Sequence, residues 1–399
     1  MSDLSESPRP VPRWLHFWAL LAVGATFLLL AVGQMVTSFR AGMADPIWPT
    51  EPWYLASNFK LDLGYLIEHS HRIIAWSLGG ILVVLGVGLW RTQPASPSRT
   101  RGTISLVVML GGFIMFHGEM GAQRGKPTAE MTWPVASTIV TLLGVAAAVG
   151  EAGSAVAKRI PGAGVRTVGV VALVAVMIQG LLGGFRVKLN ELVGTDLATV
   201  HGVFAQVVFG LLVSLAVLTA RPVSAATISR KVRMGSVVLA VLVFVQIVWG
   251  AMVRHDPTAL TQKLHFLTAF AATGIAVWLL VGIFADPAAK SRVKIGAHLL
   301  SGLLLLQLYL GVEAWMEKFG QGMLPELVPI TKENAAIRTL HALVGSALFA
   351  TSLALAVRLR QTKHVAVSGD ETADTTSAEV GTLQPMLTTA GASHPGATP

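Results

Sequence analysis

The sequence predicts an all-α, polytopic membrane protein of about ten transmembrane helices. The chain of 399 residues is 53% hydrophobic and only 13% charged, roughly half the charged fraction of a typical soluble domain. Apolar stretches close to the roughly 20 residues that cross a bilayer recur along almost the whole length. They leave no segment long enough for a separate soluble domain.

Apolar runs separated by Gly, Pro and charged residues define ten spans. The third and fourth are the weakest, because they are short, rich in Gly and Ala, and interrupted. The first is too long for a signal peptide and lacks a convincing cleavage site, so we interpret it as a retained span. The spans lie near residues 14–37, 66–90, 103–119, 133–150, 165–185, 197–219, 233–252, 262–284, 294–314 and 337–358.

Lys and Arg residues set the expected orientation. With the N-terminus inside, 18 of the 30 basic residues fall in the inner segments, whereas the outer loops carry 13 of the 21 acidic residues. Both termini are therefore predicted to face the cytoplasm. The net charge of +9 follows from this bias and does not indicate nucleic-acid binding.

The absence of cysteine excludes disulfides, iron–sulfur clusters and thioether-attached haem, so metal binding would depend on the eleven histidines. Residues 364–399 are rich in Ser, Thr, Ala, Gly and acids, with no apolar period. They are predicted to form a disordered cytoplasmic tail, and His364 and His394 belong to it.

Two pairs of segments repeat within the chain and predict two homologous four-helix bundles, at 1–220 and 221–363. The repeats are "EHSHRIIAWSLGG" (68–80) with "QKLHFLTAFAATG" (262–274), and "TVHGVFAQVVF" (199–209) with "TLHALVGSALF" (339–349). A Gln-x-x-x-Gly pattern also recurs, at Gln179/Gly183, Gln246/Gly250 and Gln307/Gly311.

The repeated histidines are 130 residues apart in the first half and 76 apart in the second. The excess of 54 residues matches the weak third and fourth spans. We therefore interpret residues from about 103 to 160 as a helical hairpin inserted into the first bundle. Two extra spans, unlike one, keep His201 on the same side of the membrane as His71.

With this topology, four histidines lie near the outer ends of helices that run in the same direction, two in each bundle. They are His71, His201, His265 and His341. Neutral imidazole is the usual axial ligand of haem iron, and a pair on facing helices can hold the macrocycle. We predict that these four histidines bind haem iron.

An isolated intramembrane histidine is more often a hydrogen-bonded or snorkelling residue than a ligand. We expect that structural role for His16 and His298, which have no counterpart in the repeat. His69, His117 and His255 are left without a role.

Seven short segments carry a family resemblance and together cover about residues 1–90 and 165–360. They are "GQMVTSFRAGMADPIWPT" (33–50), "EHSHR" (68–72), "QGLLGGFRV" (179–187), "ATVH" (198–201), "WGAMVRH" (249–255), "KLH" (263–265) and "TLH" (339–341). Together they resemble the haem A synthase family, bacterial CtaA type. The family's usual cysteine pair in the first outer loop is missing, and the hairpin lies outside its eight-helix pattern.

The resemblance implies an enzyme of the bacterial cytoplasmic membrane that oxidises the C8 methyl group of haem O to a formyl group, making haem A for terminal oxidases. It implies a bis-histidine haem b in the C-terminal half, on His265 and His341, and haem O as substrate in the N-terminal half, on His71 and His201. The implied partners are the haem O supplier, haem O synthase, and terminal oxidase assembly; a homo-oligomer is left open.

Glu68 lies three residues before His71, whereas the matched position in the second half is Gln262. Residues three apart share a helix face. A carboxylate beside bound haem can accept protons or stabilise positive charge on a reacting carbon, whereas an amide cannot take up a proton in this way. We therefore predict that Glu68 is catalytic. The alternative is that it caps the helix or pairs with Arg72.

Haem propionates near the outer face would need cationic partners. Arg254 and Arg338 are the candidates for haem b, and Arg72 for the substrate haem. Arg186 and Lys263 are further cations near the same ends of the helices.

Two other functions use the same features. A di-haem b-type electron-transfer cytochrome would keep the four ligands without chemistry on the porphyrin, but it would need no acid in one half only. A transporter or haem-handling protein is also often built from repeats, but no charged residue clearly occupies a bilayer midplane.

Overall fold

The computed structural model describes residues 11–57, 60–124, 126, 130–189, 196–220, 228–320, 322 and 328–361. The predicted tail at 364–399, with His364 and His394, lies outside the described residues. So do residues 221–227, where the boundary between the predicted bundles falls.

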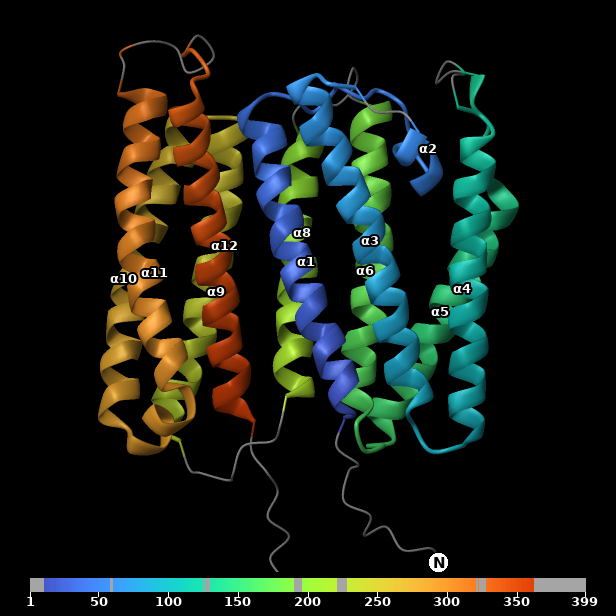
Figure 1. Cartoon of the computed structure of the whole chain (residues 1–399). Coiled ribbons are helices and arrows are strands. Elements are labelled where there is room, and N and C mark those ends of the chain that lie inside the picture. Colours follow the sequence, from blue (N-terminus) through green and yellow to red (C-terminus); the bar gives the residue numbers. More distant parts are fainter. Residues whose placement is uncertain are drawn as a thin grey trace, which may run out of the picture. The chain divides into compact units, whose positions relative to one another are not determined.

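The described residues form helices and no β-strand, and ten of these helices are long and apolar enough to cross a membrane (Figure 1). This confirms the all-α polytopic fold class, and each predicted span coincides with one long helix. The long helices are α1 (Arg13–Ser38), α3 (Leu63–Arg91), α4 (Pro97–Gly121), α5 (Val135–Ala157), α6 (Ala163–Lys188), α8 (Asp196–Thr219), α9 (Arg230–His255), α10 (Ala259–Ala285), α11 (Pro287–Phe319) and α12 (Lys332–Arg360). A short helix that the sequence did not predict, α2 (Pro52–Ser57), lies in the loop after α1.

Several helices begin earlier than the apolar pattern predicts, because polar side chains cap their first turns. Asp62, Thr258 and Thr331 each accept a hydrogen bond from the backbone N–H three residues ahead, at 2.9, 3.1 and 3.2 Å. They start α3, α10 and α12 in the manner of ordinary N-cap residues. Asp286 also caps α11, which therefore begins at Pro287, seven residues before the predicted span at 294.

Eight of the long helices pack as two groups of four. Helices α1, α3, α6 and α8 surround one apolar core, and α9, α10, α11 and α12 surround another. The groups meet where α12 contacts α1 and α8, and where α8 contacts α9. A small third core, with Leu30, Phe209 and Val213, fills the contact between them.

The remaining long helices, α4 and α5, form a hairpin that contacts α3 and α6 (Figure 1). The two helices approach closely at glycines. A Cβ on Gly112 would lie 2.7 Å from the backbone nitrogen of Thr141, and Gly144 lies directly against Met109. Close approach at small residues is a common way for helices to associate in lipid.

Helices α1, α6, α9 and α11 all run toward the end at which α3, α8, α10 and α12 begin, the upper end in Figure 1. We call this the histidine end, because the four predicted haem ligands lie there. The loop at residues 39–62, called the first loop below, connects α1 to α3 at this end and includes α2.

Candidate functional site

The four predicted haem ligands lie within the first three turns of α3, α8, α10 and α12. All four side chains are partly buried. The residues are His71, His201, His265 and His341.

In the second group, the rings of His265 and His341 lie close together in an edge-to-face arrangement. Their centroids are 6.4 Å apart, and the ring planes are inclined by 76°. A metal between them would need two metal–nitrogen bonds of about 2 Å, and each ring centre lies about 1 Å behind its nitrogen, so the span required is close to the one observed. The Nδ1 atoms of both rings are buried and have no hydrogen-bond partner in the described part of the chain. The pair therefore fits an iron with two axial imidazoles.

Among the described residues, no group of three or more His, Cys, Asp or Glu side chains could hold a bare metal ion. A haem needs only the two axial ligands from the protein, because the porphyrin supplies the other four. The donor set at the histidine end thus fits haem better than a free metal.

Each of the four rings packs against a glycine of the preceding long helix of its group. Added Cβ atoms on these glycines would lie 3.2 Å from the ring in all four cases. A side chain there would push the ring away from its site. The pairs are Gly33 with His71, Gly183 with His201, Gly250 with His265, and Gly311 with His341.

Glutamine amides contact three of the rings. The Nε2 atom of Gln179 lies 3.2 Å from Nδ1 of His201, and that of Gln246 lies 3.3 Å from Nε2 of His265. Gln307 lies 3.5 Å from Nε2 of His341. These glutamines are the ones in the Gln-x-x-x-Gly repeat, which explains why that spacing recurs.

In the first group, His71 and His201 are close enough to interact electrostatically, and both also interact with Arg186. Arg186 lies in the last turn of α6 and against Gly42 of the first loop. No hydrogen bond or ion pair to its guanidinium occurs within the described residues. A partly buried cation without a protein partner, beside two candidate ligands, is suited to bind an anionic group.

Glu68 is buried at the start of α3, with 6% of its surface exposed. Its Oε2 accepts a hydrogen bond from the backbone N–H of Asp45 at 2.8 Å, and its Oε1 pairs with Arg72 at 3.0 Å. The i,i+4 pairing with Arg72 that the sequence left as an alternative is therefore present. It fixes the carboxylate in position and does not exclude a chemical role.

Arg72 is bound on several sides by the first loop. It forms an ion pair with Asp45 at 3.1 Å and donates to the carbonyl oxygens of Ile47, at 2.6 Å, and of Asp45. Its guanidinium thus anchors the loop to α3. Of the two cations, Arg186 has the more freedom to meet a ligand in this half.

His69, which the sequence left without a role, is completely buried. Its Nδ1 lies 3.4 Å from Asp45 Oδ2, and its Nε2 lies 2.6 Å from the carbonyl oxygen of Leu55. The ring also stacks on Tyr65, with centroids 4.9 Å apart. His69 is therefore a second anchor of the first loop.

The candidate cations of the second half are partly engaged with protein. Arg254 bonds to Gln34 of α1 and donates to the carbonyl oxygen of Arg338 at 3.1 Å. Arg338 donates to the carbonyl oxygen of Glu317 at 3.4 Å, and its buried Nε has no hydrogen-bond partner in the described chain. Arg338 thus keeps a free donor near the His265–His341 pair.

The other described histidines make contacts of different kinds. His16 contacts Thr219 at 3.1 Å, and His298 bonds to the carbonyl oxygen of Lys294 in its own helix at 2.8 Å. His117 of α4 lies among aromatic rings, including Trp48 and Trp76 at 6.1 and 5.7 Å. His255, at the end of α9, interacts electrostatically with three cations, Arg186, Arg254 and Lys318.

Arg124, just after α4, connects the hairpin to the first loop. This residue forms an ion pair with Glu51, donates to the carbonyl oxygen of Pro49 at 3.1 Å, and lies over the Tyr54 ring at 4.9 Å. Together with His117 and its aromatic neighbours, these contacts fasten the inserted helices to the loop beside Glu68. The sequence did not indicate this connection, because the partners are about 70 residues apart.

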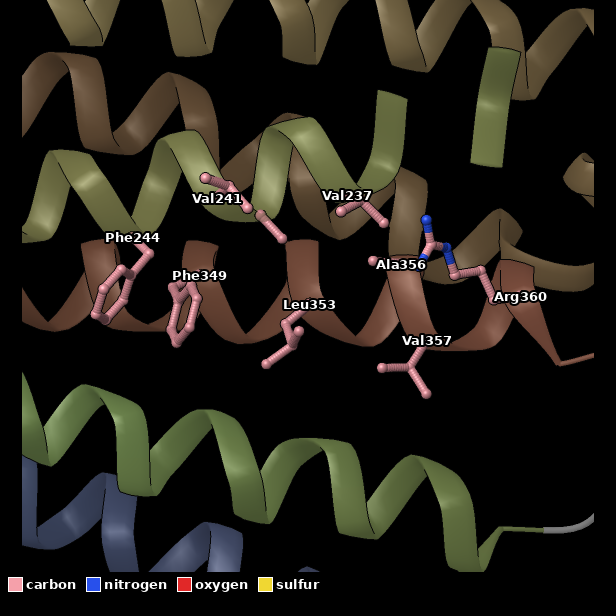
Figure 2. Close-up of a pocket in the computed structure, with 9 residues that line it drawn as sticks. Val237, Val241, Phe244, Phe349, Leu353, Ala356, Val357 and Arg360 are labelled. Atoms are coloured by element: carbon pink, nitrogen blue, oxygen red, sulfur yellow. The ribbon is translucent and has the colours of Figure 1, made fainter. Parts of the chain in front are cut away.

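Figure 2 shows a pocket of about 370 Å³ between α9 and α12. Its lining, which includes Val241, Phe244, Phe349 and Leu353, is apolar except for Arg360. Arg360 is the last residue of α12, so the pocket extends toward the end of the helices opposite the histidines. It is separate from the candidate haem sites.

Over part of its length the chain is similar to two proteins named Heme A synthase. It is 26% identical to the protein of Rhodopseudomonas palustris (strain BisB18) over 108 residues, 23% of this chain and 29% of the relative. It is 28% identical to the protein of Methylobacterium sp. (strain 4-46) over 120 residues, 25% of this chain and 32% of the relative. The match thus spans about a third of each relative's length. No family model and no solved structure matches the chain.

Proposed function

We propose that the protein is a membrane-bound oxidoreductase of the haem A synthase type, which converts the C8 methyl group of haem O to a formyl group. The distant similarity to proteins named Heme A synthase supports this at the level of the family. The observation that carries the proposal is the grouping of four histidines, two in each group of helices, with the buried carboxylate of Glu68 one turn before His71 and an amide, Gln262, at the matched position of the other half.

In this proposal the C-terminal half, 221–363, holds a resident haem b on His265 and His341. Their spacing and their unpartnered ring nitrogens fit two axial ligands. Arg338 has a free buried donor for a propionate, and Arg254 stands beside it. When bound, the haem supplies one-electron redox chemistry; the protein holds it and excludes water.

The N-terminal half, 1–220, would bind haem O as the substrate. His71 and His201 would contact its iron, and Arg186 would meet a propionate with a charge-assisted hydrogen bond. Arg72, predicted from the sequence as a substrate contact, would act mainly by holding the first loop against α3.

Glu68 would handle the protons of the reaction. Conversion of a methyl group to a formyl group removes four electrons, which must pass to an external electron acceptor, and adds one oxygen atom. Its stages release protons and build positive character on carbon. A buried carboxylate can accept those protons and stabilise that charge. The hydrogen bonds from Asp45 and Arg72 hold the carboxylate in one place, so that it needs little reorganisation.

The cellular setting is part of the same proposal. The bias of Lys and Arg supports a bacterial cytoplasmic membrane location with both termini in the cytoplasm. The histidine end would then face outward. The product would pass to terminal oxidase assembly, and haem O would come from its synthase.

Glu68→Gln is the decisive test. The amide keeps the size of the side chain but cannot take up a proton in the same way, so the variant should bind haem in both halves and accumulate haem O or a partly oxidised product. Chromatography of haems extracted from cells that supply haem O measures this directly. Glu151→Gln is the matched control, because it changes another arginine-paired acid, in the hairpin.

Normal haem A production by Glu68→Gln would overturn the catalytic role. If the unaltered protein contained haem B alone, and never haem O or haem A, the di-haem electron-transfer cytochrome would be the better description. The amide substitution also loses one of two hydrogen bonds at a buried site, at a cost of about 1–3 kcal/mol. Haem content and thermal stability should therefore be measured beside the product.

A further inference from the structure

The Gln-x-x-x-Gly repeat occurs on three of the four helices that lead to the histidine end. On α6, α9 and α11 the glycine faces a histidine ring, and the glutamine one turn earlier contacts the same ring through its amide. Each of these rings is therefore held at two points. The glycine sets how closely the ring approaches, and the amide limits its rotation.

On α1 the corresponding glycine is present, but the glutamine is not. Gly33 packs against His71 at the same 3.2 Å spacing as in the other pairs. The residue four positions earlier is Leu29, a partly buried side chain that packs against the apolar core of this group. A leucine cannot hydrogen-bond to an imidazole, and the described residues provide no hydrogen bond to the His71 ring.

The ring of His71 is also turned differently from the other three. Its Nε2 and Cδ2 atoms lie nearest to the glycine, at 3.2 and 3.4 Å from the added Cβ. In His201, His265 and His341 the nearest atoms are Cε1 and Nδ1, at 3.2 Å and 3.7–3.8 Å. The ring that lacks an amide contact is thus the ring with the different orientation.

We propose that the three glutamines are positioning residues for their histidines, and that Leu29 leaves His71 as the exchangeable axial ligand. This inference rests on the proposed function, in which one half keeps its haem and the other must release it as product. The absence of one amide would allow His71 to leave the iron while His201, held by Gln179, stays in place.

Leu29→Gln tests the proposal by restoring the missing repeat residue. The purified full-length protein is loaded with haem B, and the transfer of haem to an excess of apo-myoglobin is followed by absorbance. Leu29→Gln should slow the faster release phase by a factor of about 5–10, roughly the effect of one added hydrogen bond. It should also shift the spectrum of that haem toward the six-coordinate, low-spin form.

Leu28→Gln is the matched control, since Leu28 is 53% exposed and points away from the core. It should leave both release phases unchanged. In the opposite direction, Gln246→Leu should speed release of the slower phase by a similar factor. Gln246→Leu makes the second half resemble the first, and Leu29→Gln does the reverse. Each variant should therefore bring the rates of the two release phases closer together.

Unchanged release and spin state in both Leu29→Gln and Gln246→Leu would overturn the inference. This failure is distinct from failure of the proposed function. If the protein binds haem in both halves and shows two release phases but forms no haem A, the proposed synthase function is refuted. The effect of Leu29→Gln on haem release can still be measured in that case.

Discussion

The two groups of helices share the same packing of histidine rings against glycines, but the other side chains around the histidines differ. In both, a glycine of one helix packs against a histidine of the next. In the second group both rings contact glutamine amides, and their centroids lie 6.4 Å apart in an edge-to-face arrangement. In the first group the described residues give the His71 ring no such contact, and a buried carboxylate lies three residues before it. Arg186, which forms no hydrogen bond or ion pair within those residues, interacts with both histidines of this group. This difference shows that a few side chains can give two copies of a repeated helix arrangement different properties. We propose that the second group is a holding site, which retains its haem, and that the first group is a reacting site, where the substrate haem is bound and released.

The largest expected effect comes from removing a ligand on the holding side. His265→Ala or His341→Ala should abolish the tightly held, low-spin bis-histidine haem, because each axial bond needs its own imidazole. Haem content per protein and the low-temperature absorbance spectrum measure the loss. The first group should still take up haem.

His298→Ala is the control for these variants, since this histidine lies on α11 of the same group of helices and hydrogen-bonds to the carbonyl oxygen of Lys294 in its own helix. It should keep a full haem complement. Retention of a six-coordinate, low-spin spectrum in both ligand variants would remove His265 and His341 from the site and erase the proposed contrast between the halves.

Arg186→Ala tests the difference between the two groups of helices by changing the first group. A charge-assisted hydrogen bond contributes about 1.5–3 kcal/mol, so loss of this cation should weaken haem binding in the first group by a factor of about 10–100. The second group should be unaffected. Haem titration of the purified variant, followed by absorbance, gives both occupancies.

Arg166→Ala changes an arginine at the opposite end of the same helix, where it donates to the carbonyl oxygen of Pro161. It should bind haem normally. Equal weakening of both halves by Arg186→Ala would show that the residue supports the whole fold, and the assignment of Arg186 to the substrate would fail.

The smallest effect is expected at the clamp between the hairpin and the first loop. Arg124→Ala removes a partly exposed ion pair, which contributes about 1 kcal/mol or less. The melting temperature should fall by a few degrees, with a modest loss of haem from the first group alone. Arg101→Ala, at the more exposed pair with Glu151, should change neither haem site. An equal loss of haem from both groups would contradict this assignment.

The sequence predicted the helices well, because crossing a bilayer demands long apolar runs that are visible in one dimension. All ten spans were found, although the short α2 was missed. Errors in the long helices were confined to ends such as that of α11, where Asp286 caps the helix earlier than hydropathy alone indicates. The repeat also identified which histidines share an end of the structure. Both results follow from periodicity and length, which need no knowledge of packing.

The contacts around Glu68 could not be predicted in the same way. They depend on how the first loop folds back, where Asp45 and Leu55 reach His69 through hydrogen bonds with no sequence period. Arg186 appeared only as one of several cations. Its distinction is that Arg72 and Arg254 form hydrogen bonds with other described residues, whereas Arg186 forms none with them, which only a three-dimensional structure reveals.

The hairpin also affects the order in which a growing chain can complete its sites. Its two helices are consecutive in the sequence and pack closely at Gly112 and Gly144. They can therefore pair as soon as α5 has been synthesised. They can then hold the first loop through Arg124 before α6 and α8 exist. The extra distance between His71 and His201, 130 residues against 76 in the second half, costs less than about 1 kcal/mol in loop closure. The insertion therefore affects the order of assembly. During synthesis, the hairpin can bind the first loop before His201, the second histidine of the first group, emerges from the ribosome.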